Sequence, residues 1–221
     1  MSILSAPHET LEQKAEAQQA AMQSYYTLHA QIYDSTRWTF LFGRDRILQL
    51  LPLPKDTTGL IVEVGCGTGY NLIQLAKQYP KAQLCGIDTS TDMIAQSEKK
   101  MRVYSNRTTL IDKPYIKDHD FAWAEKPSLI LFSYSLTMIN PYWSELLDQA
   151  YADLAPGGHI AVVDFHQSPR EWFKNWMLRN HVRMDAHILP VLEAQYTTEH
   201  SEVCAAYGGT WQYMLFIGKK A

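Results

Sequence analysis

The stretch of this chain that decides its fold is Ile61-Val62-Glu63-Val64-Gly65-Cys66-Gly67-Thr68-Gly69-Tyr70-Asn71. A short apolar run ends in an acidic residue, three glycines follow at alternate positions, and a helix-like stretch comes next. Because glycine accepts positive φ values and carries no Cβ, the pattern predicts a strand that enters a tight loop whose backbone approaches a ligand closely. The next apolar run ends in Asp88, where a carboxylate can accept hydrogen bonds from both hydroxyls of a ribose.

The spacing of the glycines separates two kinds of nucleotide-binding loop. The dinucleotide fingerprint G-x-G-x-x-G has its third glycine one residue later than Gly69, at the position of Tyr70. The form E-x-G-x-G-x-G, together with Asp88 and the later segment Leu154-Ala155-Pro156-Gly157-Gly158, resembles the class I S-adenosylmethionine-dependent methyltransferases. The alternative is an α/β domain whose loop binds another nucleotide.

The alternation of apolar runs and helix-like stretches predicts an α/β fold. Strands are expected over 60–64, 83–87, 108–111, 129–134, 159–164 and 211–217, and helices over 9–31, 40–50, 70–78, 91–101, 143–154 and from about residue 170. Such alternation favours a Rossmann-like, mostly parallel, doubly wound sheet of the class I methyltransferase type with extra N-terminal helices. We expect one domain, with a helical cap over 1–55 and the core over 56–221.

Composition narrows the class of protein. The 221 residues carry a formal net charge of −3 and are 46% apolar, so a full core is expected and no nucleic acid partner is indicated. Three scattered cysteines form neither a zinc pattern nor C-x-x-C, and no secretory signal precedes residue 20. We therefore expect a cytoplasmic protein, or one bound peripherally to the inner membrane surface. Nothing in the sequence indicates its oligomeric state.

The resemblance implies S-adenosylmethionine as the cofactor. The glycines would bring backbone amides to its methionine portion, Glu63 would meet its ammonium group, Asp88 the ribose, and Asp112 the adenine amino group. The alternative for each carboxylate is a solvated strand end. The residues assigned to the cofactor are Glu63, Gly65, Gly67, Gly69, Asp88, Thr89, Asp112 and Ser133.

The segment after the fourth predicted strand limits which methyl-transfer mechanisms are expected. It reads Ser133-Tyr134-Ser135-Leu136, which lacks the Asn/Asp-Pro-Pro-aromatic motif of many base and amide N-methyltransferases. The chain also lacks the Pro-Cys nucleophile of C5 methylation, and lacks carboxylates at the place where magnesium-dependent catechol enzymes carry them. No metal is therefore expected, and direct SN2 transfer to a positioned, desolvated nucleophile remains.

Three further segments narrow the resemblance. They cover residues 32–44, 132–139 and 162–165, and together with the glycine loop they resemble the betaine-lipid methyltransferases. Those enzymes trimethylate the amino group of diacylglyceryl homoserine. The resemblance extends over roughly residues 26–170; His166 departs from the small residue expected after Asp-Phe, and the segment after Arg170 matches weakly.

An amine acceptor assigns roles to aromatic side chains. An alkylamine is a nucleophile only when neutral, and a dry pocket favours that form. The methylated product is a fixed cation, which aromatic faces stabilise by about 0.5–2 kcal/mol each. Tyr33, Trp38 and Tyr134 are the candidates near the predicted crevice, with core packing as the alternative.

Charged and polar candidates complete the acceptor site. Arg37 or Arg44 is expected to pair with the homoserine carboxylate, and His166 to take a proton from the incoming ammonium. The alternatives are a surface charge at a helix end for each arginine and a polar rim position for the histidine. Tyr33, Tyr134 and His166 are thus the catalytic candidates, and Arg37, Trp38 and Arg44 the substrate-binding ones.

A tryptophan-rich helix suggests how a lipid would be reached. Trp172, Phe173, Trp176 and Met177 are predicted on one helical face, with Lys174 and Arg179 elsewhere, as suits an anionic membrane interface. The alternative is a helix packed on the sheet. Two rivals to the lipid interpretation also remain: a methyltransferase for a soluble small molecule, such as a quinone precursor or natural product, and a cofactor-binding partner subunit that does not catalyse.

Overall fold

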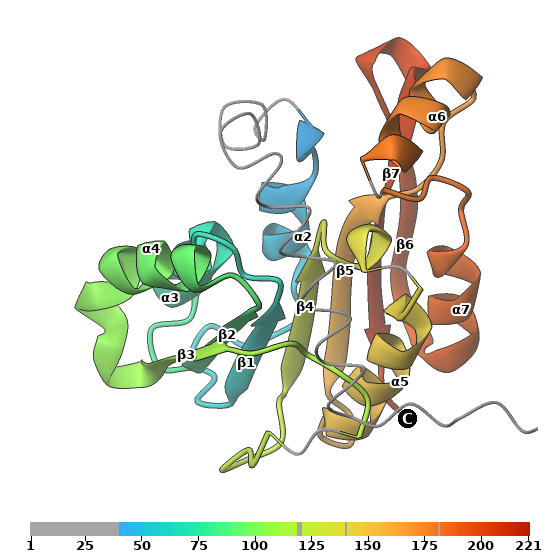
Figure 1. Ribbon diagram of the computed structural model, residues 1–221. Helices are drawn as coiled ribbons and strands as arrows, with labels where there is room; N and C mark the ends of the chain where they lie inside the picture. Colours follow the sequence, from blue (N-terminus) through green and yellow to red (C-terminus); the bar gives the residue numbers. More distant parts are fainter. Residues whose placement is uncertain (1–39, 119–120, 140, 181) are drawn as a thin grey trace, which may run out of the picture.

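The computed structural model describes residues 40–118, 121–139, 141–180 and 182–221 (Figure 1). The helix predicted over 9–31 lies outside these residues, as do the candidates Tyr33, Arg37 and Trp38. No helix in the described part of the chain combines the length and the apolar character needed to cross a membrane.

A seven-stranded sheet forms the centre of the described residues, in the order β3-β2-β1-β4-β5-β7-β6. Strands β1 to β5 pair in parallel, and β7 is antiparallel to both β5 and β6. The mostly parallel, doubly wound sheet expected from the sequence is confirmed. The strands are β1 (Leu60–Val64), β2 (Gln83–Asp88), β3 (Thr108–Asp112), β4 (Leu129–Ser133), β5 (His159–Phe165), β6 (Thr197–Ala206) and β7 (Trp211–Lys219).

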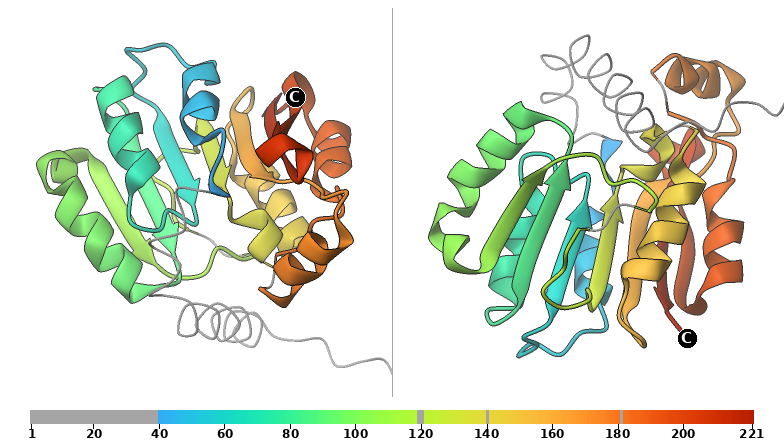
Figure 2. Two further views of the ribbon diagram at one scale, coloured as in Figure 1. Left: turned by 90° about the horizontal axis from the view of Figure 1, so that it is seen from above. Right: turned by 60° about the horizontal axis from the view of Figure 1, so that its bottom comes forward.

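Helices cover both faces of the sheet, as Figure 2 shows. They are α2 (Arg44–Leu50), α3 (Tyr70–Gln78), α4 (Thr91–Met101), α5 (Trp143–Asp153), α6 (Glu171–Arg179) and α7 (Ile188–Gln195), with 3₁₀ turns η1 (Arg102–Arg107), η2 (Leu136–Met138) and η3 (Tyr207–Gly209). Successive strand residues alternate between two cores: Ile61 packs with side chains of α2, α3 and α6, whereas Val62 packs with those of α5 and α7.

Local chemistry explains most helix bounds. Helices α3 and α4 have the predicted bounds, and the Ser90 hydroxyl caps α4 by accepting from the backbone N–H of Met93 at 3.4 Å. The prediction of a helix over 40–50 is wrong about where the helix begins. Residues 41–43 leave the helix, and α2 begins after Gly43, whose φ is +79°.

Two elements of the C-terminal part were not predicted. Helix α7 contains Pro190 in its first turn, where a missing N–H costs no hydrogen bond, although the proline reads as a helix breaker in the sequence. Strand β6 is an edge strand of mostly exposed polar residues, so it lacks the apolar run by which the other strands were found.

Candidate functional site

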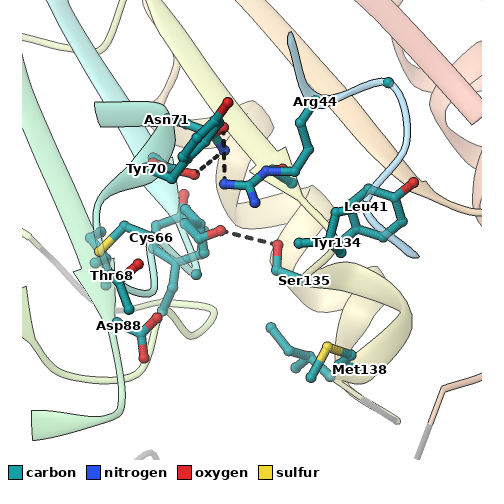
Figure 3. A pocket seen from close by; sticks show the side chains of 18 of the residues that line it. Leu41, Arg44, Cys66, Thr68, Tyr70, Asn71, Asp88, Tyr134, Ser135 and Met138 are labelled. Carbon is teal, nitrogen blue, oxygen red and sulfur yellow. Dashed lines mark hydrogen bonds between the residues drawn. The ribbon is translucent and has the colours of Figure 1, made fainter. Parts of the chain in front are cut away.

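A cavity of about 1070 Å³ opens at the carboxyl ends of the parallel strands (Figure 3). The chain passes from β1 to β2 and β3 in one direction and from β4 to β5 in the other, so the strand order reverses between β1 and β4. Ligands of open α/β sheets bind at such a reversal. The wall includes Glu63 of β1, Asp88 of β2, Ser133 of β4 and Arg44 of α2.

The glycine loop after β1 is shaped for close approach. Gly65 and Gly69 both have a φ of +76°. A Cβ on Gly65 would stand 2.7 Å from the Cβ of Ser135, and one on Gly69 would stand 2.4 Å from the hydroxyl of Ser97. Other residues at these two positions would therefore push the loop out of place, which explains the first and third glycines of the motif.

Asp88 is buried at the end of β2 and bound to the glycine loop. Its carboxylate accepts the backbone N–H of Gly67 at 2.7 Å and that of Ser90 at 3.0 Å. Thr89 and Ser133 line the same cavity. Asp112 lies opposite Asp88 in the β2–β3 register, but it is exposed and is not part of the cavity wall.

Two side chains of opposite charge, Glu63 and Arg44, are linked by hydrogen bonds through Asn71, and we call them the charge pair. The side-chain amide of Asn71 donates to the buried carboxylate of Glu63 at 2.6 Å, and the guanidinium of Arg44 donates to the Asn71 carbonyl at 3.3 Å. Arg44 also lies over the ring of Tyr70, 4.2 Å from its centroid. Figure 3 shows Arg44, Tyr70 and Asn71 together on one side of the cavity. Sequence reasoning did not assign a role to Asn71, whose partners come from outside its own helix.

Tyr134 contributes a ring to the wall rather than an available base. Its hydroxyl donates to the backbone carbonyl of Phe42 at 2.7 Å, and its ring meets Phe165 edge to face at 4.8 Å. Burial, and secondarily the charge of Asp164, raises the pKa of this phenol well above its usual range. The phenol therefore stays neutral at pH 7, and its φ of +56° is unusual for a large side chain.

The structure does not bring His166 to the cavity. Its backbone N–H donates to the carbonyl of Gln212 at 2.9 Å, and its carbonyl accepts the N–H of Ala186 at 2.8 Å. The imidazole is half-buried, burial lowers its pKa, and it is not part of the cavity wall.

The predicted apolar face of α6 is divided. Phe173 and Met177 are 5% and 4% exposed and belong to the core, whereas Trp172 and Trp176 are 66% and 46% exposed. The expectation of one shared face is therefore wrong. Steps of about 100° per residue turn Phe173 toward the buried Trp211, with which it stacks at 6.5 Å, and leave the two tryptophans on the outside.

Comparisons with known proteins find methyltransferases among the relatives of this chain. A sequence family described as "Methyltransferase domain" matches residues 33–196, which is more than half of the chain. Trans-aconitate 2-methyltransferase from Paracidovorax citrulli is 29% identical over 126 residues, which are 54% of this chain and 45% of that protein. The chain thus spans less than half of this relative's length.

Solved structures show the same fold. The 1,6-didemethyltoxoflavin-N1-methyltransferase of Burkholderia thailandensis aligns with a TM-score of 0.69 at 14% identity, over 99% of this chain and 93% of that one. The N-methyltransferase NodS of Bradyrhizobium japonicum, in complex with S-adenosylhomocysteine, aligns with a TM-score of 0.62 at 21% identity, over 81% and 87%. The doubly wound sheet, the glycine cradle beside two buried carboxylates and the family match lead to one conclusion: the chain belongs to the class I S-adenosylmethionine-dependent methyltransferases.

Proposed function

We propose that this protein methylates the amino head group of a lipid, and that diacylglyceryl homoserine is the acceptor, converted to its trimethylated betaine form by direct SN2 transfer. S-adenosylmethionine supplies the electrophilic methyl group when bound. The protein's own residues then have three tasks: to hold the two ends of the cofactor, to keep the acceptor amine neutral and in line, and to admit a molecule with an apolar tail.

The charge pair at one end of the cavity suits an α-amino acid group. Glu63 would meet the ammonium of the methionine portion, while Arg44, connected to it through Asn71, would pair with the carboxylate. This assignment moves Arg44 from the acceptor, where sequence reasoning put it, to the cofactor. Asp88 would hold the ribose from the end of β2.

Aromatic side chains form much of the remaining wall. A desolvated amine stays neutral more readily than one in water, and the quaternary cation that methylation produces is attracted to ring faces. The cavity therefore suits an acceptor nitrogen that gains positive charge as methyl groups accumulate. The aromatic side chains of the wall are Phe42, Tyr70, Tyr115, Tyr134 and Tyr213.

The observation that carries the lipid proposal is a surface of four exposed rings, joined by the half-buried ring of Phe40, that reaches the cavity. We name Phe40, Phe42, Trp172, Trp176 and Tyr207 the aromatic band. Phe40 lies 6.1 Å from Trp176 and 6.5 Å from Tyr207, and Tyr207 lies 5.3 Å from Phe42, which lines the cavity. An acceptor with its head in the cavity would find an apolar path for its tail along this band.

The aromatic band also lies at the same end of the sheet as the cavity. Because β7 is antiparallel to β5, with Tyr213 opposite Phe165, the turn that carries Tyr207 lies at the carboxyl ends of the parallel strands. Helix α6 lies at the same end in Figure 1. Its two cations, Lys174 and Arg179, together with Arg170 at its N-cap, outnumber its one anion, Glu171, so this end is suited to an anionic lipid surface.

The proposal is tested by methyl transfer from radiolabelled S-adenosylmethionine to diacylglyceryl homoserine in mixed vesicles. Label should enter the lipid, and mass spectrometry should show one to three added methyl groups. Soluble homoserine serves as the matched acceptor, since it has the same head group without the tail. Transfer to homoserine at the rate of the lipid would refute the role of the band, and transfer to neither would refute the acceptor.

A soluble carboxylate is the second candidate acceptor. Four cationic side chains line the cavity, and one relative acts, by its name, on trans-aconitate, a molecule that carries carboxylates. Trans-aconitate in the same assay separates the two proposals, because a methyl ester is cleaved by mild base and a methylamine is not. The four cations are Arg44, Arg46, Lys100 and Lys113.

A further inference from the structure

The segment after β4, residues 134–139, shapes the cavity and is held in an unfavourable conformation. We call it the β4 loop. Tyr134, Ser135, Met138 and Ile139 from this loop line the cavity. Tyr134 has a φ of +56°, a region that large side chains avoid. A strained residue at a ligand site persists only where its surroundings hold it, so the contacts of this loop indicate how the site is set.

Two of those contacts tie the loop to neighbouring parts of the cavity wall. The Tyr134 hydroxyl donates to the carbonyl of Phe42 at 2.7 Å, and the Ser135 hydroxyl donates to the carbonyl of Val64 at 3.0 Å. Ser135 also packs on Gly65 so closely that a Cβ there would overlap it. A displacement of the β4 loop would therefore be transmitted to the glycine loop.

The third contact is a fully buried carboxylate. Asp164, in β5, accepts the backbone N–H groups of Leu136 at 2.9 Å and Thr137 at 3.3 Å. The hydroxyl of Thr137 donates to the same carboxylate, and the N–H of Phe165 adds a bond at 2.8 Å. Each of these partners is a donor, which suits an acceptor-only carboxylate and not an amide, whose NH₂ would face other donors.

We propose that Asp164 is a positioning residue, which sets the cavity for methyl transfer by fixing the β4 loop against the glycine loop. Asp164 is not part of the cavity wall, so it acts through Leu136 and Thr137 and not by touching a ligand. Asp164 lies in a segment that carries the resemblance, but sequence reasoning gave it no role, because its donors lie in a different loop. This role concerns any acceptor and does not depend on the lipid proposal.

The test alters Thr137, a hydrogen-bond donor to Asp164, and leaves the Asp164 carboxylate in place. Thr137→Val removes the hydroxyl at nearly constant shape, and Thr137→Ser keeps the hydroxyl while removing a methyl group. Ser168→Ala is the matched control: its buried hydroxyl donates to Thr210 at 2.7 Å, away from the cavity wall. The measurement is the affinity for S-adenosylhomocysteine by titration calorimetry, at a temperature where circular dichroism shows each variant folded.

Thr137→Val should weaken S-adenosylhomocysteine binding by about tenfold, which corresponds to 1.4 kcal/mol. Thr137→Ser should stay close to wild type, and Ser168→Ala should lose thermal stability without losing affinity. Wild-type affinity in folded Thr137→Val would overturn the proposal. So would an equal loss in Thr137→Ser, since the hydroxyl would then be irrelevant, or an equal loss in Ser168→Ala, since affinity would then follow general stability.

Discussion

The proposed cofactor end and the proposed acceptor end of the cavity are built in different ways. At the cofactor end, Glu63, Asn71 and Asp88 come from consecutive elements of the chain and bind one another or the glycine loop through short hydrogen bonds. At the proposed acceptor end, Phe42, Tyr134 and Tyr213 come from three distant segments. They meet through one ring contact, between Phe42 and Tyr213, and one hydrogen bond, from Tyr134 to the backbone carbonyl of Phe42. The first end is specified locally, whereas the second exists only when the whole sheet has formed.

The largest effect on the cofactor end is expected from Asp88→Ala. Two ribose hydroxyls would lose a charged acceptor, and such bonds contribute about 1.5–3 kcal/mol each, so binding of S-adenosylhomocysteine should weaken by at least about a hundredfold. The measurement is titration calorimetry. Asp112→Ala tests the adenine assignment beside it, and we expect a much smaller loss because Asp112 is exposed and outside the cavity wall. Unchanged affinity in Asp88→Ala would contradict the ribose assignment.

Asp164 gives the largest expected dependence of stability on pH. Burial raises the pKa of this carboxyl to about 6, against the opposing effect of hydrogen bonds from Thr137 and nearby backbone N–H groups. Because the pKa is higher in the folded than in the unfolded state, the contribution of Asp164 to stability is complete below about pH 4 and is lost as pH rises through about 6. The loss is about 3 kcal/mol, since each pKa unit corresponds to about 1.4 kcal/mol.

Urea unfolding of wild type and Asp164→Asn at about pH 4 and about pH 7 measures this loss. The stability advantage of wild type over the variant should shrink by about 3 kcal/mol between the two values. If Asp164→Asn does not fold, Thr137→Val replaces it: removing a donor that lowers the pKa should move the transition to higher pH. Parallel pH profiles for wild type and variant would show that Asp164 does not titrate in this range.

Arg44 decides which ligand the charge pair serves. If it pairs with the methionine carboxylate, Arg44→Gln should weaken S-adenosylhomocysteine about tenfold and leave 5′-methylthioadenosine, which lacks the amino acid group, almost unaffected. Arg46→Gln is the matched comparison, because Arg46 also lines the cavity but pairs with Glu202 at 2.6 Å. Normal S-adenosylhomocysteine affinity combined with lost turnover would return Arg44 to the acceptor.

The same contrast explains what could be predicted from the sequence. The bounds of α3 and α4 were found because periodicity, Ser90 and the glycines are local signals. The roles of Asn71 and Asp164 were missed because each depends on a partner from another element. Strand β6 was missed because an exposed polar edge strand has no apolar run, and the division of the α6 face depended on where Trp211 lies.

Substitutions in the aromatic band are expected to have the smallest effect, and they test the acceptor end most directly. Trp172 and Trp176 are exposed on α6, so replacing both by alanine should leave the fold intact. If the band meets a lipid surface, Trp172→Ala with Trp176→Ala should reduce cosedimentation with anionic vesicles by about fivefold, or about 1 kcal/mol, at low salt. Binding of wild type should also fall as salt rises, because the cations of α6 contribute through a screened attraction.

Leu178→Ala is the matched control, because Leu178 is exposed on the same helix but outside the band. It should sediment as wild type does. Equal sedimentation of the double tryptophan variant and wild type would mean that the band does not contact lipid, and the soluble acceptor would then be the better proposal. Normal cofactor affinity in the double variant would show that the two ends of the cavity act separately, as their construction implies.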